Sequence, residues 1–181
     1  MGQIISLTGA SGAGKDVIAR ALGFSYVTST TTRLPRPTDR LGEYEFLEME
    51  EFKELQAWGA FAWDDEYSGN SYGTKREILD KALQSSSNWV MTMLHELMPS
   101  LLGYVGKEPE KSILPFYIRS PPEQVLRARM QQRGDKADSI ERRLRENRDL
   151  DQKVESSGLP YIFMTNNGTI EEAVAQVKKY L

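Results

Sequence analysis

A lysine preceded by closely spaced glycines is the clearest chemical feature of the sequence. The segment Gly9-Ala10-Ser11-Gly12-Ala13-Gly14-Lys15-Asp16 follows an apolar run at 4–8 and precedes 17–22, where apolar residues recur at helical spacing. A strand, a glycine-rich turn and a helix form the context of a phosphate-binding loop, in which backbone N–H groups and the helix N-terminus surround an anion. We therefore expect residues 9–16 to bind a di- or triphosphate, with Lys15 on the terminal phosphates.

Asp16 departs from the usual loop pattern, in which a Ser or Thr hydroxyl at this position contacts Mg²⁺. A carboxylate is also a hard oxygen ligand. We therefore expect Asp16 to hold Mg²⁺ directly or through a water molecule, although it also brings negative charge close to the phosphates.

Two groups of arginines supply further positive charge. Arg33 and Arg36 lie in a polar, proline-bounded turn at 30–37, where two guanidinium groups beside several hydroxyls can make forked contacts to one phosphate. Arginines also crowd residues 127–148, on both sides of Gly134. One interpretation is a helix pair stabilised by ion pairs with nearby acidic residues. The other is a lid whose inward arginines close over phosphates, with Gly134 allowing the bend between its arms.

Composition limits the classes of protein to which the chain can belong. Its 181 residues suffice for one α/β domain with a substantial core, and 39% hydrophobic and 27% charged residues are ordinary for a globular protein. No apolar run approaches 18 residues and no signal-peptide pattern is present, so we predict no membrane partner and a cytoplasmic location. The absence of cysteine excludes disulfides and thiolate chemistry, and a net charge of −3 argues against a general nucleic-acid binder.

Apolar patterns predict the elements that position these groups. Runs typical of buried parallel strands cover 88–94 and 112–118. Further strands are predicted at 4–8, at 23–29 and at 161–165. Helical spacing predicts helices at 17–22, at 75–84, from Pro121 through Met130, at 139–146 with Ser139 as its cap, and at 169–181. A polar connection containing Gly and Pro links the strands at 88–94 and 112–118.

Residues 33–74 are expected to form a small insertion between strands of the main sheet. Its predicted elements are a strand at 42–47, a short helix at 49–58 and an extended segment at 61–67. Residues 68–74 are predicted as a turn into the next helix, with Thr74 as its N-cap and Glu77 completing a capping box. An insertion of this kind usually holds a second substrate.

With these pieces in place, the chain resembles the guanylate kinase family over nearly its whole length. The pieces that match, in the family's order, are the loop from Gly9, residues 29–36, Tyr44-Glu45-Phe46, residues 69–74, the arginines at 127–148, and Asn166-Asn167 after the last strand. Several ordered motifs at near-family spacing are far more specific than a phosphate loop alone. The Gly-Lys-Asp ending of the loop is also similar to ribose bisphosphate phosphokinases, which are not expected to carry the Thr-Thr-Arg-x-Pro-Arg segment.

The resemblance implies roles for individual side chains. The acceptor phosphate would be held by a serine, two arginines and two tyrosines, which correspond to Ser29, Arg33, Arg36, Tyr44 and Tyr72. The donor phosphates and the moving phosphoryl group would be clamped by Arg129, Arg133 and Arg143, which complete the catalytic set with Lys15 and Arg33. Residues 9–16 and Asn166 would bind the donor nucleotide.

This chain differs from the family mainly at the positions that contact guanine in the family. Trp63, followed by Asp64, stands at the place of a glutamate, and Thr92 and Leu94 stand at the places of two aspartates; a hydroxyl is kept as Thr74. A carboxylate accepts well from the N1–H and N2–H₂ donors of guanine. A shift of one residue would therefore give Asp64 this role, with Trp63, Thr74 and Thr92 as the other base contacts. Alternatively, Trp63, Thr92 and Leu94 only fill the core.

Together these features predict an α/β P-loop three-layer fold with a five-stranded parallel core sheet. The core would comprise about 1–32, 75–126 and 149–181, the acceptor-binding insertion about 33–74 and the lid about 127–148. The expected activity is the phosphorylation of a nucleoside monophosphate, GMP or dGMP first, by ATP with Mg²⁺, in a monomer or homodimer. The alternatives are a kinase for another or a modified deoxynucleoside monophosphate or for ribose 1,5-bisphosphate, and a non-catalytic binding module that docks partner proteins. The single histidine, His95, is expected to be structural.

Overall fold

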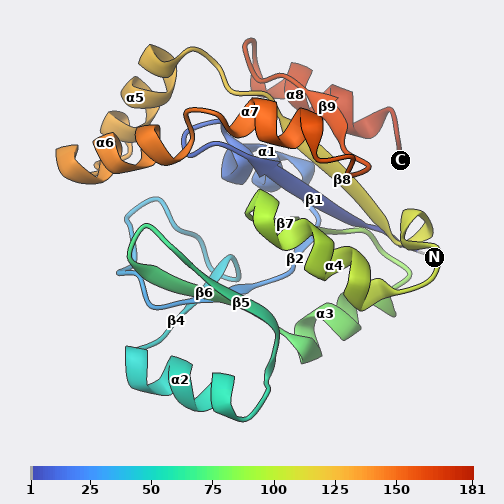
Figure 1. The fold of residues 1–181 in the computed structure, drawn as a ribbon. Coiled ribbons are helices and arrows are strands. Elements are labelled where there is room, and N and C mark those ends of the chain that lie inside the picture. Colours follow the sequence, from blue (N-terminus) through green and yellow to red (C-terminus); the bar gives the residue numbers. More distant parts are fainter. Residues whose placement is uncertain (1) are drawn as a thin grey trace.

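The core of the molecule is a five-stranded sheet in which every neighbouring pair of strands is parallel. The computed structural model describes residues 2–181, and the strand order is β2-β7-β1-β8-β9. The strands are β1 (Ile4–Gly9), β2 (Ser25–Tyr26), β7 (Trp89–Thr92), β8 (Ile113–Ile118) and β9 (Ile162–Met164). The central strand β1 and its neighbours β7 and β8 are almost entirely buried because helices surround the sheet (Figure 1). The predicted five-stranded parallel sheet is confirmed.

Some of the helices around this sheet were predicted from the sequence and others were not. The predicted ones are α1 (Lys15–Leu22), α3 (Arg76–Leu83) and α8 (Ile170–Lys178), and α1 packs against α8. Thr169 caps α8 by accepting from the backbone N–H of Glu172 at 3.2 Å, and Glu172 reciprocates. Two further helices, α4 (Met98–Val105) and α7 (Leu150–Ser156), were not predicted, and two short 3₁₀ segments span His95–Leu97 and Pro109–Lys111. Thus the stretch between β7 and β8, which was predicted as a polar connection, is largely helical.

A second, four-stranded sheet carries the insertion. Its strands are β3 (Ser29–Thr31), β4 (Tyr44–Phe46), β5 (Phe61–Tyr67) and β6 (Asn70–Lys75), in the order β4-β3-β6-β5, and α2 (Met49–Ala57) packs on β5. Pairs β3–β6 and β5–β6 are antiparallel. Figure 1 shows this sheet and α2 beside the core, with the two chain termini at the opposite side of the molecule.

The predicted turn at 68–74 is wrong, because only Ser68 and Gly69 turn and the rest is strand β6. The glycine-rich composition that indicated a turn has a packing cause. A Cβ on Gly73 would lie 2.7 Å from Cδ1 of Phe61, so the close approach of that ring requires glycine in the strand. Thr74 is therefore paired with Trp63 across β5–β6 and is not the helix N-cap, which is Lys75.

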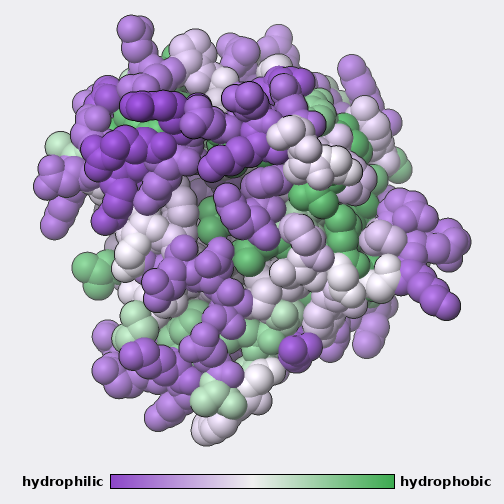
Figure 2. Space-filling model, viewed as in Figure 1, coloured by the Kyte–Doolittle hydropathy of each residue, from purple (hydrophilic) through white to green (hydrophobic). Residues whose placement is uncertain are grey.

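The arginine-rich segment folds as two helices, α5 (Glu123–Gln132) and α6 (Ala137–Glu146). The predicted start of the second helix at Ser139 is wrong, since it begins at Ala137 with Lys136 as the cap. Gly134 lies between the helices with φ of 87°, a conformation that favours glycine. Figure 2 shows hydrophilic side chains gathered over this part of the molecule. We refer to α5, α6 and the turn between them as the lid.

Candidate active site

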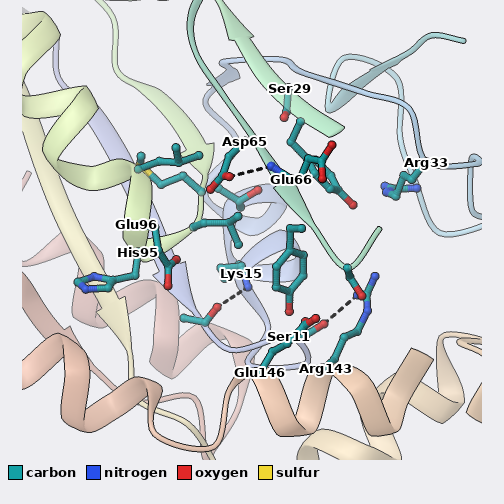
Figure 3. Close-up of a pocket in the computed structure, with 18 of the residues that line it drawn as sticks. Ser11, Lys15, Ser29, Arg33, Asp65, Glu66, His95, Glu96, Arg143 and Glu146 are labelled. Carbon is teal, nitrogen blue, oxygen red and sulfur yellow. Dashed lines mark hydrogen bonds between the residues drawn. The ribbon is translucent and has the colours of Figure 1, made fainter. Parts of the chain in front are cut away.

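A cavity of about 460 Å³ opens where the core strands end, between the second sheet and the lid. Of the residues singled out in the sequence, those that line it are Gly9, Ser11, Lys15, Asp16, Ser29, Arg33, Arg36, Tyr44, Trp63, Tyr72, Thr74, Thr92, Leu94, His95, Arg133 and Arg143. Figure 3 shows how Lys15 approaches the cavity from the phosphate loop, Arg33 from the insertion and Arg143 from the lid. Segments far apart in the sequence therefore meet at one site.

Lys15 is hydrogen-bonded to backbone carbonyl groups of the phosphate loop. The ammonium of Lys15 donates to the carbonyl oxygens of Gly9 at 2.7 Å and Ala10 at 3.0 Å. Burial lowers the pKa of Lys15 to about 8, and the charges of Arg133 and Arg143 act in the same direction, whereas Asp16 opposes them. Burial therefore disfavours the charged ammonium, and a phosphate bound beside it would offset that cost.

Arg129 and Asn166 support the loop from outside the cavity. Arg129 Nη1 donates to the carbonyl oxygens of Gly12 and Ala13 at 3.3 Å each, and its Nη2 donates to that of Asn166 at 3.0 Å. Asn166 Nδ2 donates to the carbonyl of Ala13 at 2.8 Å. Gly14, with φ of 103°, has no room for a side chain, because a Cβ would lie 2.2 Å from Asn166 Nδ2. In this geometry Arg129 and Asn166 fix the loop's shape, and neither lines the cavity.

Arg33 lies on the insertion side and is almost fully buried. Its Nη1 and Nη2 donate to the two carboxylate oxygens of Asp39, both at 2.8 Å, and Nη1 also donates to the carbonyl of Leu34. The guanidinium stacks over the ring of Tyr44, 4.3 Å from its centroid. These bonds use three of the five N–H donors of an arginine, which leaves two for a ligand. Asp39, which sequence reasoning missed, therefore orients Arg33.

Lid arginines reach across to the phosphate loop. Arg143 is 5% exposed, and its Nη1 donates to Ser11 Oγ at 3.0 Å, while Arg133 Nη2 approaches the same oxygen at 3.4 Å. Among residues 2–181, nothing accepts a hydrogen bond from the buried Nε of Arg143. A buried cationic donor without a partner is costly, so the site is suited to an anion.

The residues that depart from the family pattern also line the cavity. Trp63 is buried and lines the cavity with Thr74, Thr92 and Leu94. The Thr92 hydroxyl is 2.9 Å from that of Tyr26, so it is already hydrogen-bonded within the protein. His95 also lines the cavity, but its Nδ1 lies 3.2 Å from the hydroxyl of Tyr161, and burial lowers its pKa.

The position of Asp64 does not support the hypothesis that it contacts the base. Asp64 is exposed and accepts from Gln56 Nε2 at 2.6 Å, outside the cavity. Asp65 lines the cavity instead, and so does Glu66. Asp65 lies two residues after Trp63, and side chains two apart share a face of a strand. Alternation along 61–67 was the signal that could have identified Asp65. Two further carboxylates at the cavity, Glu96 and Glu146, had no signal in the sequence.

Comparison with known proteins places this geometry in a family. The family model described as guanylate kinase matches residues 1–181. The chain belongs to the guanylate kinase family. The guanylate kinase of Trichormus variabilis is 36% identical over 150 residues, which cover 79% of this chain and 73% of that one. The guanylate kinase of Granulibacter bethesdensis is 31% identical over 190 residues, 99% of this chain and 84% of that one.

The fold agrees with a solved member of the family. The crystal structure of guanylate kinase from Anaplasma phagocytophilum superposes with a TM-score of 0.73, at 21% sequence identity, covering 99% of this chain and 84% of that one. Within residues 2–181, no helix is both long and apolar enough to cross a membrane. In the same part of the chain, no three or more Asp, Glu or His side chains are grouped to hold a metal ion.

Proposed function

We propose that this member of the guanylate kinase family transfers the terminal phosphoryl group of ATP to GMP, giving ADP and GDP. The observation that carries the proposal is the meeting of cationic groups from three separate segments at one cavity: Lys15 from the phosphate loop, Arg33 and Arg36 from the insertion, and Arg133 and Arg143 from the lid. Two phosphorylated ligands need such an arrangement, since each brings several negative charges to the point where they react.

Phosphoryl transfer between nucleotides requires positioning and charge neutralisation more than covalent chemistry by the protein. In the proposed complex, Lys15 and the loop N–H groups bind the donor phosphates, and the two free N–H groups of Arg33 bind the acceptor phosphate. Arg133 and Arg143 neutralise the charge that develops on the phosphoryl group. The lid, which already contacts Ser11, keeps out the water that would otherwise accept that group.

Asp16 is the residue proposed to hold Mg²⁺. It lines the cavity next to Lys15, and its carboxylate is the hard oxygen ligand that this cation prefers. One protein carboxylate is enough for such a site, because Mg²⁺ bound with nucleotides commonly keeps water and phosphate oxygens as its other ligands. The cation would supply further neutralisation of phosphate charge.

For the base, we propose that Asp65 accepts from the N1–H and N2–H₂ donors of guanine. Its position on the same strand face as Trp63, at the cavity, supports this role, and the hydroxyl of Thr74 lies on the paired strand. Trp63 offers its ring as an apolar wall. A monomeric or homodimeric state and a cytoplasmic location are predictions that accompany this proposal.

A second candidate function follows from the same pocket. Where the family pattern has carboxylates, this chain has Trp63, Thr92 and Leu94, and the Thr92 hydroxyl is engaged with Tyr26. These changes favour a re-specified acceptor, either another nucleoside monophosphate or a sugar phosphate such as ribose bisphosphate.

Coupled detection of ADP release from Mg-ATP tests both candidates, with the common ribo- and deoxynucleoside monophosphates and ribose bisphosphate as acceptors. Selective turnover of GMP or dGMP supports the proposed function. Preference for another acceptor overturns the base assignment and supports re-specification. No turnover with any acceptor, while ATP still binds, would overturn both candidates and favour a non-catalytic binding module.

A further inference from the structure

Asp135 lies in the turn between the two helices of the lid, and its carboxylate is withdrawn from solvent. The residue follows Gly134, and its side chain is only 3% exposed. Carboxylates this deeply buried need cationic or hydrogen-bonding partners. Neither the sequence patterns nor the proposed reaction assigns a role to this group.

Three arginines from two parts of the molecule surround it. Both Nε and Nη2 of Arg133 donate to the Asp135 carboxylate, with Nε 3.3 Å from Oδ1. Arg36 Nε lies 3.5 Å from Oδ1, and Arg143 Nη1 lies 3.9 Å from Oδ2. Burial acts to raise the pKa of Asp135, but the hydrogen bonds from Arg133 and the charges of the other arginines hold it below its ordinary value. The group is therefore an anion shared by three cations.

The same three arginines line the cavity, whereas Asp135 does not. The carboxylate therefore contacts these guanidinium groups without being part of the cavity lining. Arg36 belongs to the acceptor side, and Arg133 and Arg143 belong to the donor side. Like-charged guanidinium groups repel one another. Burial lowers the pKa of Arg36, and the charge of Arg133 acts in the same direction. A shared anion between them fixes both their orientation and their separation.

Another contact already joins the lid to the second sheet. Arg142 Nε donates to Ser68 Oγ at 2.9 Å, and its Nη2 donates to the Ser68 carbonyl at 2.8 Å. This contact does not involve Asp135 or the cavity arginines. The contact between the lid and the insertion therefore does not depend on Asp135 alone. The role that remains for Asp135 is to arrange the three arginines.

We propose that Asp135 is a positioning residue that sets the spacing between the acceptor-phosphate site at Arg36 and the donor-phosphate site at Arg133 and Arg143. This inference rests on the proposed function, because the two sites matter only if two nucleotides bind together. Its consequence is specific: loss of the carboxylate disturbs the joint placement of the two ligands more than the binding of either ligand alone.

The test compares Asp135→Asn with the unsubstituted protein and with Asp138→Asn, which removes the same charge from an exposed position on the same lid. The probes are ATP alone, GMP alone, and a bisubstrate analogue in which adenosine and guanosine are joined through five phosphates. For Asp135→Asn we expect at least a 30-fold loss of affinity for the analogue and a similar loss in kcat. The affinities for ATP and for GMP alone should change less than threefold. All values for Asp138→Asn should stay within twofold, and Asp135→Glu should recover part of the loss.

The possible failures are distinguishable. Analogue affinity within threefold of the unsubstituted protein would overturn the role of Asp135. An equal loss of affinity for all three probes would also overturn it, since that pattern indicates general damage to the fold. If the unsubstituted protein binds ATP but neither GMP nor the analogue, the proposed function itself fails.

Discussion

Replacement of Arg33 by lysine keeps the positive charge but removes the planar fork. In the structure, Asp39 holds one edge of the guanidinium at 2.8 Å to each oxygen, and Leu34 accepts from Nη1, which leaves Nε–H and one Nη2–H for the proposed acceptor phosphate. A hydrogen bond to a charged group contributes about 1.5–3 kcal/mol. Lysine can restore one such bond to the acceptor phosphate but not two. Because each 1.4 kcal/mol is tenfold, KM for the acceptor should rise by about 10- to 150-fold.

The same substitution should affect the donor little, because Arg33 contacts Leu34, Asp39 and the ring of Tyr44, all on the insertion side. Initial rates with varied GMP at saturating ATP, and with varied ATP at saturating GMP, separate the two effects. KM for ATP should stay within about twofold. The matched control is Arg40→Lys, an exposed arginine in the same segment. Equal increases in both KM values, or an unchanged KM for GMP, would refute the assignment of Arg33 to the acceptor phosphate.

Three further substitutions test separate parts of the account. Lys15→Ala should lower kcat by about 10²–10³, the cost of removing one preorganised electrostatic donor, while circular dichroism stays unchanged; a fully active variant would contradict the role of the loop. Gly73→Ala should destabilise the fold by about 1–3 kcal/mol through overpacking, measured as a lower midpoint in urea, whereas Gly103→Ala, in an open position on α4, should not. Asp65→Asn should raise KM for GMP at least tenfold, and Asp64→Asn should leave it unchanged. If Asp64→Asn raised KM and Asp65→Asn did not, the base contact would belong to Asp64.

Local patterns predicted the parts of the site that depend on neighbouring residues. Residues 9–16 and the strand before them carry the whole geometry of a phosphate loop within one short segment, so Lys15 could be located from spacing alone. The buried strands β1, β7 and β8 were equally predictable from their apolar runs. The strand predicted at 23–29 was less accurate, since only Ser25–Tyr26 form β2 and Ser29 begins β3 of the second sheet. In contrast, α4 was missed because Pro99 and Gly103 are typical of a connection, although proline fits the first turn of a helix.

Contacts between distant segments could not be predicted in this way. Asp64 and Asp65 are the same residue type, and only the pairing of β5 with β6 decides which of them faces the cavity. Strand β6 was mistaken for a turn because the need for Gly73 arises from an aromatic ring on another strand. Likewise, the burial of Asp135 depends on the lid meeting the insertion, which no periodicity in the sequence encodes.

In the proposed reaction, one cavity holds a donor and an acceptor nucleotide, and the phosphoryl group passes between them rather than to water. Phosphorus NMR of a mixture of the protein, Mg-ATP and GMP follows every product at once. We expect ADP and GDP to appear in equal amounts, with no inorganic phosphate above the rate without protein. Formation of ADP with an equal amount of inorganic phosphate, and no GDP, would contradict the account.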